Sequence, residues 1–86
     1  MEYQIRIKKS AIKELSKLPK PVATKISNTI DEFKTNPFPA GFKKLKGSDN
    51  DYRVRVGDYR ILYTIYNNIL TIEVVKIAHR KDVYKK

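Results

Sequence analysis

Positively charged side chains are concentrated in two short stretches in the second half of the chain. Residues 52–63 read YRVRVGDYRILY and include Arg53, Arg55 and Arg60, while residues 79–84 read HRKDVY and include the only histidine, His79. Arginine binds phosphate through planar, bidentate hydrogen bonds and keeps its charge. Histidine titrates near neutral pH and can transfer protons. Together the two stretches indicate chemistry at a phosphate group.

Cleavage of RNA by its own 2′-hydroxyl would use such side chains. The attack requires removal of the hydroxyl proton, neutralisation of charge on the phosphorane oxygens and protonation of the 5′-oxygen. Arginine suits the second task and His79 the proton transfer, while Tyr84 could stack on a base or hydrogen-bond near the hydroxyl. No carboxylate cluster suggests a metal nuclease, so neither a metal site nor a cofactor is expected.

A hairpin would bring the arginines together. Gly57-Asp58 suits a two-residue turn between two strands, and such a turn places Arg55 directly opposite Arg60. Arg53 then lies opposite Leu62, diagonal to Arg60 on the same face. Like charges facing each other across strands cost stability, so we expect an anion to lie between them.

A second two-residue turn is predicted at Asn67-Asn68, because asparagine tolerates positive φ. This turn pairs Tyr66 with Ile69 and sets Arg60 opposite Val75. Continued alternation along the last strand then gives the sheet two distinct faces. The face expected beneath the helices carries Tyr52, Val54, Tyr59, Ile61, Tyr63, Ile65, Leu70, Ile72 and Val74. The opposite face carries Arg53, Arg55, Arg60, Leu62, Thr64, Glu73, Val75, Ile77 and His79.

The remaining elements complete an α+β fold. Residues 3–8 alternate like a strand, and Ser10 is a plausible N-cap for a helix that ends before Pro19. A second helix is expected from Pro21 to the Asn36-Pro37 stop, and residues 42–46 form a short basic edge strand. We therefore predict a single domain, residues 1–86. It has a mostly antiparallel sheet of four to five strands, and an N-terminal two-helix hairpin packs on one face.

The charge balance bounds the possible partners. A net charge of +10 in 86 residues implies an anionic partner such as nucleic acid, an anionic membrane surface or an acidic protein. A solvated lysine coat is the plain alternative. The chain has no cysteine, no signal peptide is recognisable, and no apolar run is long enough to span a bilayer. We expect a cytoplasmic protein.

Each candidate residue also has an ordinary structural interpretation. Arg53 and Arg55 could form the solvated face of a hairpin, and a lone His79 is more often a surface residue than a catalyst. Tyr84 could simply attach the C-terminus to the core. General electrostatic contact or solubility would explain Lys44 and Lys46. Four tyrosines of the expected strands, Tyr3, Tyr52, Tyr59 and Tyr63, are better explained as core.

The order of these segments resembles the RelE/ParE toxin superfamily, and its RelE branch more closely. The resemblance covers nearly the whole chain, including KKLKG at residues 43–47, YRVRVGDYR at 52–60 and HRKDVY at 79–84. It implies a RelE-like microbial RNase fold and a toxin that cuts mRNA in the ribosomal A site without a metal, neutralised by a cognate antitoxin. It also implies catalytic roles for Arg60, His79, Arg80 and Tyr84. RNA-binding roles are expected for Arg53, Arg55, Lys44, Lys46 and Lys81.

Two other functions compete with this one. A ParE-like toxin would inhibit DNA gyrase by protein binding, although the intact ending from His79 to Tyr84 argues against that branch. A non-catalytic nucleic-acid-binding module would explain the charge equally well. Growth arrest with cut mRNA, a DNA damage response, or no toxicity would distinguish the three.

Overall fold

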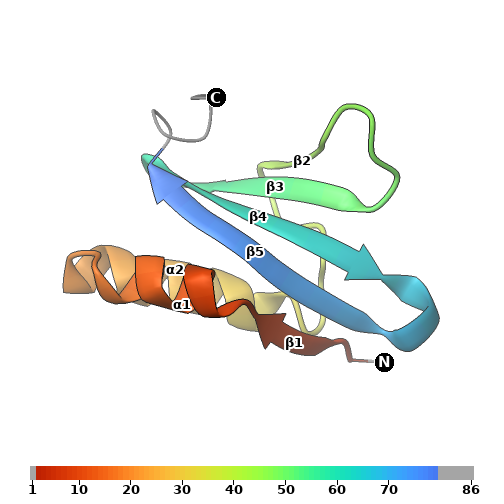
Figure 1. Cartoon of the computed structure of the whole chain (residues 1–86), viewed down its shortest axis with the longest axis horizontal. Helices are drawn as coiled ribbons and strands as arrows, with labels where there is room; N and C mark the ends of the chain where they lie inside the picture. Colours follow the sequence, from red (N-terminus) through yellow and green to blue (C-terminus); the bar gives the residue numbers. More distant parts are fainter. Residues whose placement is uncertain (1, 80–86) are drawn as a thin grey trace.

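Two helices cover one face of a sheet (Figure 1), and no helix of residues 2–79 covers the other, which we call the open face. The computed structural model describes residues 2–79. In that range five strands form one sheet in the order β1-β5-β4-β3-β2. The strands are β1 (Gln4–Ile7), β2 (Phe42–Lys44), β3 (Asp51–Val56), β4 (Tyr59–Tyr66) and β5 (Thr71–His79). β1 runs parallel to β5 and the other pairs are antiparallel, which confirms the predicted fold class.

The two helices begin where the chain leaves the sheet. α1 (Lys9–Ser16) starts one residue before the predicted cap, so the prediction of Ser10 as N-cap is wrong. Lys8 stays extended because its N–H donates to the Val74 carbonyl (3.0 Å), and the chain turns only after that bond. α2 (Lys20–Glu32) follows with Pro21 in its first turn, as predicted. Neither helix is long and apolar enough to cross a bilayer.

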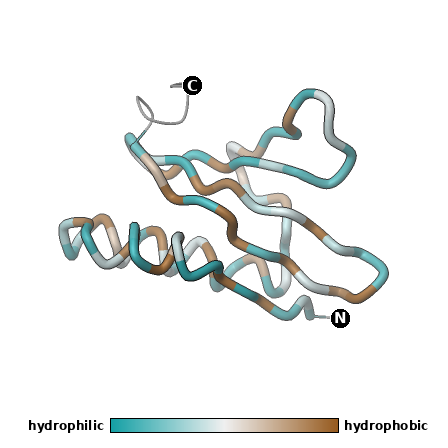
Figure 2. Tube along the Cα trace, in the orientation of Figure 1, coloured by the Kyte–Doolittle hydropathy of each residue, from teal (hydrophilic) through white to brown (hydrophobic). Residues whose placement is uncertain are grey.

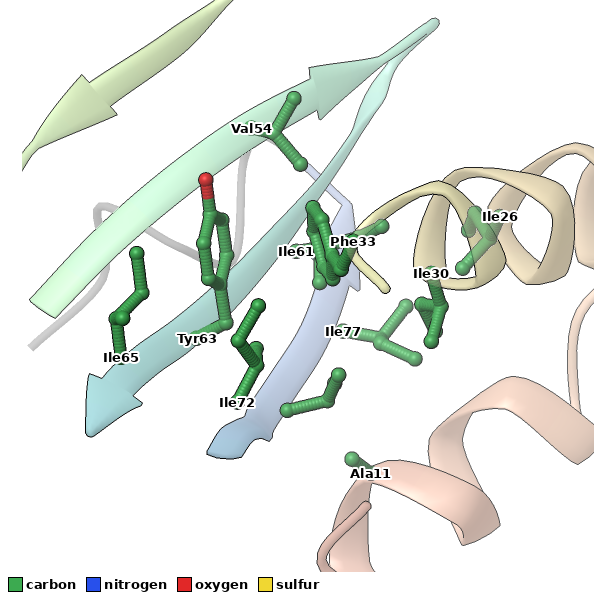
Figure 3. Close-up of a cluster of buried hydrophobic side chains, with 11 residues drawn as sticks. Ala11, Ile26, Ile30, Phe33, Val54, Ile61, Tyr63, Ile65, Ile72 and Ile77 are labelled. Carbon is green, nitrogen blue, oxygen red and sulfur yellow. The ribbon is translucent and has the colours of Figure 1, made fainter. Parts of the chain in front are cut away.

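The core lies between the helices and the sheet (Figure 3). Hydrophobic positions recur along the strands and along one stripe of each helix, as the hydropathy colouring shows (Figure 2). The fully buried side chains come from both layers and include Ala11, Ile26, Ile30, Phe33, Val54, Ile61, Tyr63, Ile65, Ile72, Val74 and Ile77. The helix-covered face was therefore predicted correctly for β3, β4 and the first half of β5.

The β3–β4 hairpin has the predicted register. Val56 pairs with Tyr59 and Arg55 with Arg60 around a loop of two residues. Gly57 has φ +60°, a left-handed conformation that favours glycine, and this suits the first central position of a type II′ turn.

The β4–β5 connection differs from the prediction. Residues Asn67–Ile69 form a short 3₁₀ helix, Leu70 adopts a left-handed conformation (φ 48°), and Tyr66 pairs with Thr71 rather than with Ile69. The pairing then slips at a β-bulge: Tyr63 pairs with Val74, but Leu62 pairs with Lys76, so Val75 is the extra residue.

The bulge reverses the faces of the last part of β5. Ile77, expected on the open face, is 2% exposed and pairs with Ile61 in the core. Arg60 lies opposite Ala78 rather than Val75, and His79 lies opposite Tyr59 on the helix-covered side. The prediction that Val75, Ile77 and His79 continue one face in strict alternation is therefore wrong.

Candidate nucleic-acid interface

The open face of the sheet carries the arginines in adjacent rows. Arg55 and Arg60 face each other across β3 and β4, and Arg53 faces Leu62 one row further along. Directly opposed side chains on antiparallel strands have Cβ atoms about 5 Å apart. The predicted convergence of the three arginines on the face away from the helices is thus confirmed in register and in side.

Arg60 is the least accessible of the three. The sequence predicted its face of the sheet correctly, but the side chain is only 7% exposed on that face. A guanidinium cannot be deprotonated in a protein, so this position holds a permanent positive charge below the surface. Coulomb attraction is stronger away from bulk water, and an anion above Arg60 would therefore be held more tightly than one at an exposed lysine.

Arg55 is exposed but oriented by its own turn. Its Nε donates a hydrogen bond to the Gly57 carbonyl oxygen (3.3 Å). An arginine has five N–H donors, and this bond uses only one of them. The turn that aligns the two strands therefore also orients one of the guanidinium groups.

The lysines of β2 are divided between the two sides of the sheet. Lys43 pairs with Arg53, and Lys44 pairs with Tyr52 in the row that leads to the buried Tyr63. Lys43 therefore shares the arginine side and Lys44 does not, while Lys46 is exposed in the loop after β2. The β2–β3 register decides which lysine shares the arginine side, and no two-residue turn between these strands fixes that register in the sequence.

Lys76 also lies on the arginine side, where it is exposed opposite Leu62. Strict alternation from Ile72 and Val74 would have put this charged side chain beneath the helices, which is energetically implausible. That conflict was the signal of the bulge in the sequence. The bulge also places the cation of Lys76 in the same row as Lys43 and Arg53.

His79 contacts the helix side instead of the arginines. Its ring meets the Tyr59 ring edge-on, with centroids 5.3 Å apart, and it borders a hollow of about 250 Å³ lined also by Glu14, Lys17 and Leu18. A carboxylate oxygen of Glu14 accepts a hydrogen bond from the Ile77 backbone N–H (3.0 Å) and so ties α1 to β5. Proton transfer by His79 stays a prediction, without the shared face that supported it.

The other predicted site residues, Arg80, Lys81 and Tyr84, lie outside the described residues.

Four tyrosines belong to the core or pack against it, as expected: Tyr3, Tyr52, Tyr59 and Tyr63. Tyr63 is 1% exposed and its hydroxyl donates to the Pro37 carbonyl (2.7 Å), which attaches the loop after α2 to the sheet. Burial, with a smaller contribution from Tyr52, raises the pKa of the Tyr63 phenol far above its usual range. The phenol therefore stays a hydrogen-bond donor at any physiological pH.

A cavity of about 270 Å³ opens beside the arginine rows. It is lined by Lys8, Leu45, Asp51, Leu62, Tyr63, Thr64, Tyr66, Glu73 and Val75. Asp51 is occupied by local bonds, since its carboxylate accepts from Ser48 Oγ (2.8 Å) and Thr64 Oγ1 (2.6 Å). The cavity was not predicted, because the bulge at Val75 and the loop carrying Leu45 form part of its wall.

The fold and the basic open face are those expected of a RelE-like toxin, and comparison with known proteins identifies the same class of protein. Residues 5–84 match the family described as ParE toxin of type II toxin-antitoxin system, parDE. The chain belongs to this family and is a toxin of a toxin–antitoxin system, of the RelE-like kind.

The most informative relatives are archaeal. A protein named RelE1 from Methanocaldococcus jannaschii is 38% identical over 99% of this chain and 98% of its own length. Toxin RelE3 from the same organism is 34% identical over 88% of this chain and 89% of its own. One chain in the crystal structure of the archaeal RelE–RelB complex from Pyrococcus horikoshii matches this protein with 30% sequence identity and a TM-score of 0.83. The match covers 93% of this chain and 97% of the chain in that structure.

Proposed function

We propose that this toxin is an endoribonuclease that cuts mRNA in the ribosomal A site by attack of the 2′-hydroxyl, without a metal ion. The observation that carries the proposal is the placement of Arg53, Arg55 and Arg60 in neighbouring positions of one open face. Three guanidinium groups at such spacing repel one another unless an anion lies between them. A phosphodiester passing to a phosphorane provides that anion, with its charge increasing in the transition state.

The position of each residue on the sheet suggests its role in cleavage. Arg60 holds a buried charge for the phosphorane oxygens, and Arg53 with Lys43 binds the neighbouring backbone phosphate. Arg80 is assigned a second positive charge at the reacting phosphate, and Tyr84 a hydrogen bond near the 2′-hydroxyl. His79, on the helix-covered side, is assigned a minor part in proton transfer. Lys44, Lys46 and Lys81 would contact RNA outside the reacting phosphate, including ribosomal RNA.

Primer extension on mRNA during translation, with and without ribosomes, tests this function. We expect cuts at codons only when ribosomes are present, with cyclic-phosphate and 5′-hydroxyl ends and no sensitivity to a chelator. The double variant Arg53→Ala/Arg55→Ala should lose cleavage because both phosphate-binding side chains are removed. Absence of cuts with the unchanged protein, or cuts in naked RNA at the same rate, would reject ribosome-dependent cleavage.

A matched control distinguishes the effect of these two arginines on cleavage from the effect of a lower net charge. Lys20→Ala/Lys25→Ala removes the same two charges from exposed positions of α2, on the helical layer. It should cut like the unchanged protein. Equal loss in both double variants would mean that only the overall charge matters, and the open face would not be the site.

We also propose that a cognate antitoxin covers the open face. The solved archaeal relatives from P. horikoshii and Methanococcus jannaschii are both complexes of RelE with RelB, which supports an antitoxin partner here. A basic face needs an acidic or apolar covering segment. Hydrogen exchange of the complex should show protection over β3 and β4, and protection confined to α1 and α2 would contradict blocking at this face.

Inhibition of DNA gyrase is the second candidate, because the matched family is described as ParE toxin. A supercoiling assay with purified gyrase distinguishes the two functions. Inhibition of supercoiling together with a DNA damage response and intact mRNA would favour this candidate over mRNA cleavage.

A further inference from the structure

The open face has two chemically different halves. The rows that hold Arg55 with Arg60, and Lys43 with Arg53 and Lys76, are cationic. The next row holds two carboxylates, with Asp51 opposite Thr64 and Thr64 opposite Glu73, and it ends at the cation Arg6 of β1, which pairs with Glu73. Successive rows on one face are two residues apart, which is about 6.6–6.8 Å along the strands. This spacing is comparable with the span of one nucleotide, so a phosphate on the cationic rows would place a base over the row of Thr64 and Glu73.

The cavity lies over this row, and Lys8 also lines it. Its volume of about 270 Å³ is at the lower limit of sites for small molecules, which suits a single base. Leu62 and Val75 give it apolar walls, and both are only partly buried on a face with no covering helix. An apolar slot beside bound phosphates matches a base, which has an apolar flat face and a polar edge.

Tyr66 offers that flat face a stacking partner. It lines the cavity, is 38% exposed, and stands on β4 on the same side as Leu62 and Thr64. Aromatic side chains on an open sheet bind single-stranded RNA by stacking on bases.

Glu73 is placed to read the polar edge. Its side chain makes no hydrogen bond or ion pair with any residue in 2–79, whereas the Asp51 carboxylate is already occupied by Ser48 and Thr64. An ionised carboxylate accepts hydrogen bonds and cannot donate them. It therefore favours an edge with amino groups and disfavours uracil, whose single ring N–H lies between two carbonyl oxygens.

We propose that the cavity formed by Leu62, Tyr66, Glu73 and Val75 is a base-specificity pocket. It binds an unpaired RNA base next to the phosphate held by the arginines and selects guanine, adenine or cytosine against uracil. The pocket rests on the proposed function for its biological meaning, since it sets which codons are cut. Binding of RNA to it requires no cleavage and can be measured separately.

Fluorescence anisotropy with short single-stranded RNAs tests the pocket directly. The probes are labelled pentaribonucleotides of uracil in which the central base is guanine, adenine, cytosine or uracil, with 2′-methoxy groups to prevent cutting. The unchanged protein should bind the all-uracil probe about tenfold or more weakly than the others, the effect of one hydrogen bond to a charged group. Equal affinity for all four probes overturns the pocket.

Two variants with controls assign the roles. Glu73→Gln, which keeps the shape but can also donate, should bring the four affinities to within about twofold, while Glu32→Gln on α2 keeps the original preference. Tyr66→Ala should lower the affinity for all four probes on the order of tenfold. Tyr66→Phe should retain binding because the ring is kept. A folded Glu73→Gln protein with the original preference overturns the assignment of Glu73, and unchanged binding by Tyr66→Ala overturns the stacking.

The outcome is distinguishable from that of the proposed function. A protein that discriminates the probes but leaves translating mRNA intact would reject ribosome-dependent cleavage and support the pocket. A protein that cuts mRNA with wild-type efficiency but binds all probes alike would reject the pocket alone. With Glu73→Gln, cleavage at codons with uracil should rise relative to the others, and loss of all cleavage would contradict a role limited to base selection.

Discussion

The two hairpins of the sheet follow different rules. The β3–β4 hairpin turns at Gly57-Asp58 and keeps one register from Val56–Tyr59 to Asp51–Thr64. The β4–β5 hairpin closes through a 3₁₀ helix and changes register at Val75. In the first, a local turn fixes which side chains meet across the strands. In the second, the packing of the end of β5 against α1 determines the pairing, and this pairing separates His79 from the arginines.

The energetic reason for the bulge lies at Ile77. If β5 alternated regularly through Val75, Lys76 would point beneath the helices and Ile77 would face solvent. With it, Ile77 is 2% exposed in the core and its N–H is bonded to Glu14. Burying an aliphatic side chain instead of an unpaired lysine outweighs the loss of regular pairing at one position.

The largest effect is expected from Arg60→Ala, in the regular hairpin. Removing a preorganised donor for transition-state charge typically lowers kcat about 10²–10³-fold. Because Arg60 is buried, we also expect a loss of about 1–3 kcal/mol in the free energy of unfolding, which denaturant titration measures. Arg60→Lys keeps the charge without the planar fork and should cut at an intermediate rate. Cleavage at the original rate by folded Arg60→Ala would remove Arg60 from the mechanism.

Truncation of Ile77 probes the irregular hairpin. The bulge at Val75 places Ile77 in the core opposite Ile61, where it is 2% exposed. Ile77→Ala should lower the free energy of unfolding by about 2–5 kcal/mol, the usual cost of truncating a core isoleucine to alanine, which denaturant titration measures. Val75→Ala, at the partly buried extra residue, is the control and should cost far less. Equal stability of the two variants would mean that the bulge does not serve the core.

A smaller effect is expected from Gly57→Ala at the turn of β3–β4. Gly57 has φ +60°, where a side chain costs roughly 1–2 kcal/mol. No heavy atom lies within 4 Å of the added Cβ, so conformational strain and not a clash is the cause. Thermal unfolding measures the loss. An unchanged melting temperature would show that the turn adapts and does not set the register by itself.

The smallest effect on activity is expected from His79→Gln. Its ring contacts Tyr59 on the helix-covered side, away from Arg55 and Arg60, so cleavage should fall less than tenfold. Primer extension beside Arg60→Ala compares the two directly. A loss as large as that of Arg60→Ala would mean that the ring reaches the reacting phosphate in the substrate complex, as the sequence first suggested.

Sequence reasoning succeeded where a single local signal decides the structure. The Gly57-Asp58 turn set the pairing of Arg55 with Arg60, and alternation identified the buried face that carries Val54, Ile61 and Tyr63. It failed at Ser10 and at Asn67-Asn68, where contacts distant in sequence overrode the local signal. Lys8 is held by Val74, and Leu70 accepts a left-handed conformation that residue preference would assign to asparagine.

The sequence by itself determined the α+β class, the helix-covered layer and the meeting of three arginines, because turn chemistry and period-2 alternation act over a few residues. The tertiary structure alone decided that Arg60 is buried, that Lys43 rather than Lys44 joins the arginine side, and that His79 lies across the sheet. It also formed the cavity over Glu73. These features depend on how β5 packs against α1 and β4, and such packing balances contacts between residues far apart in the chain.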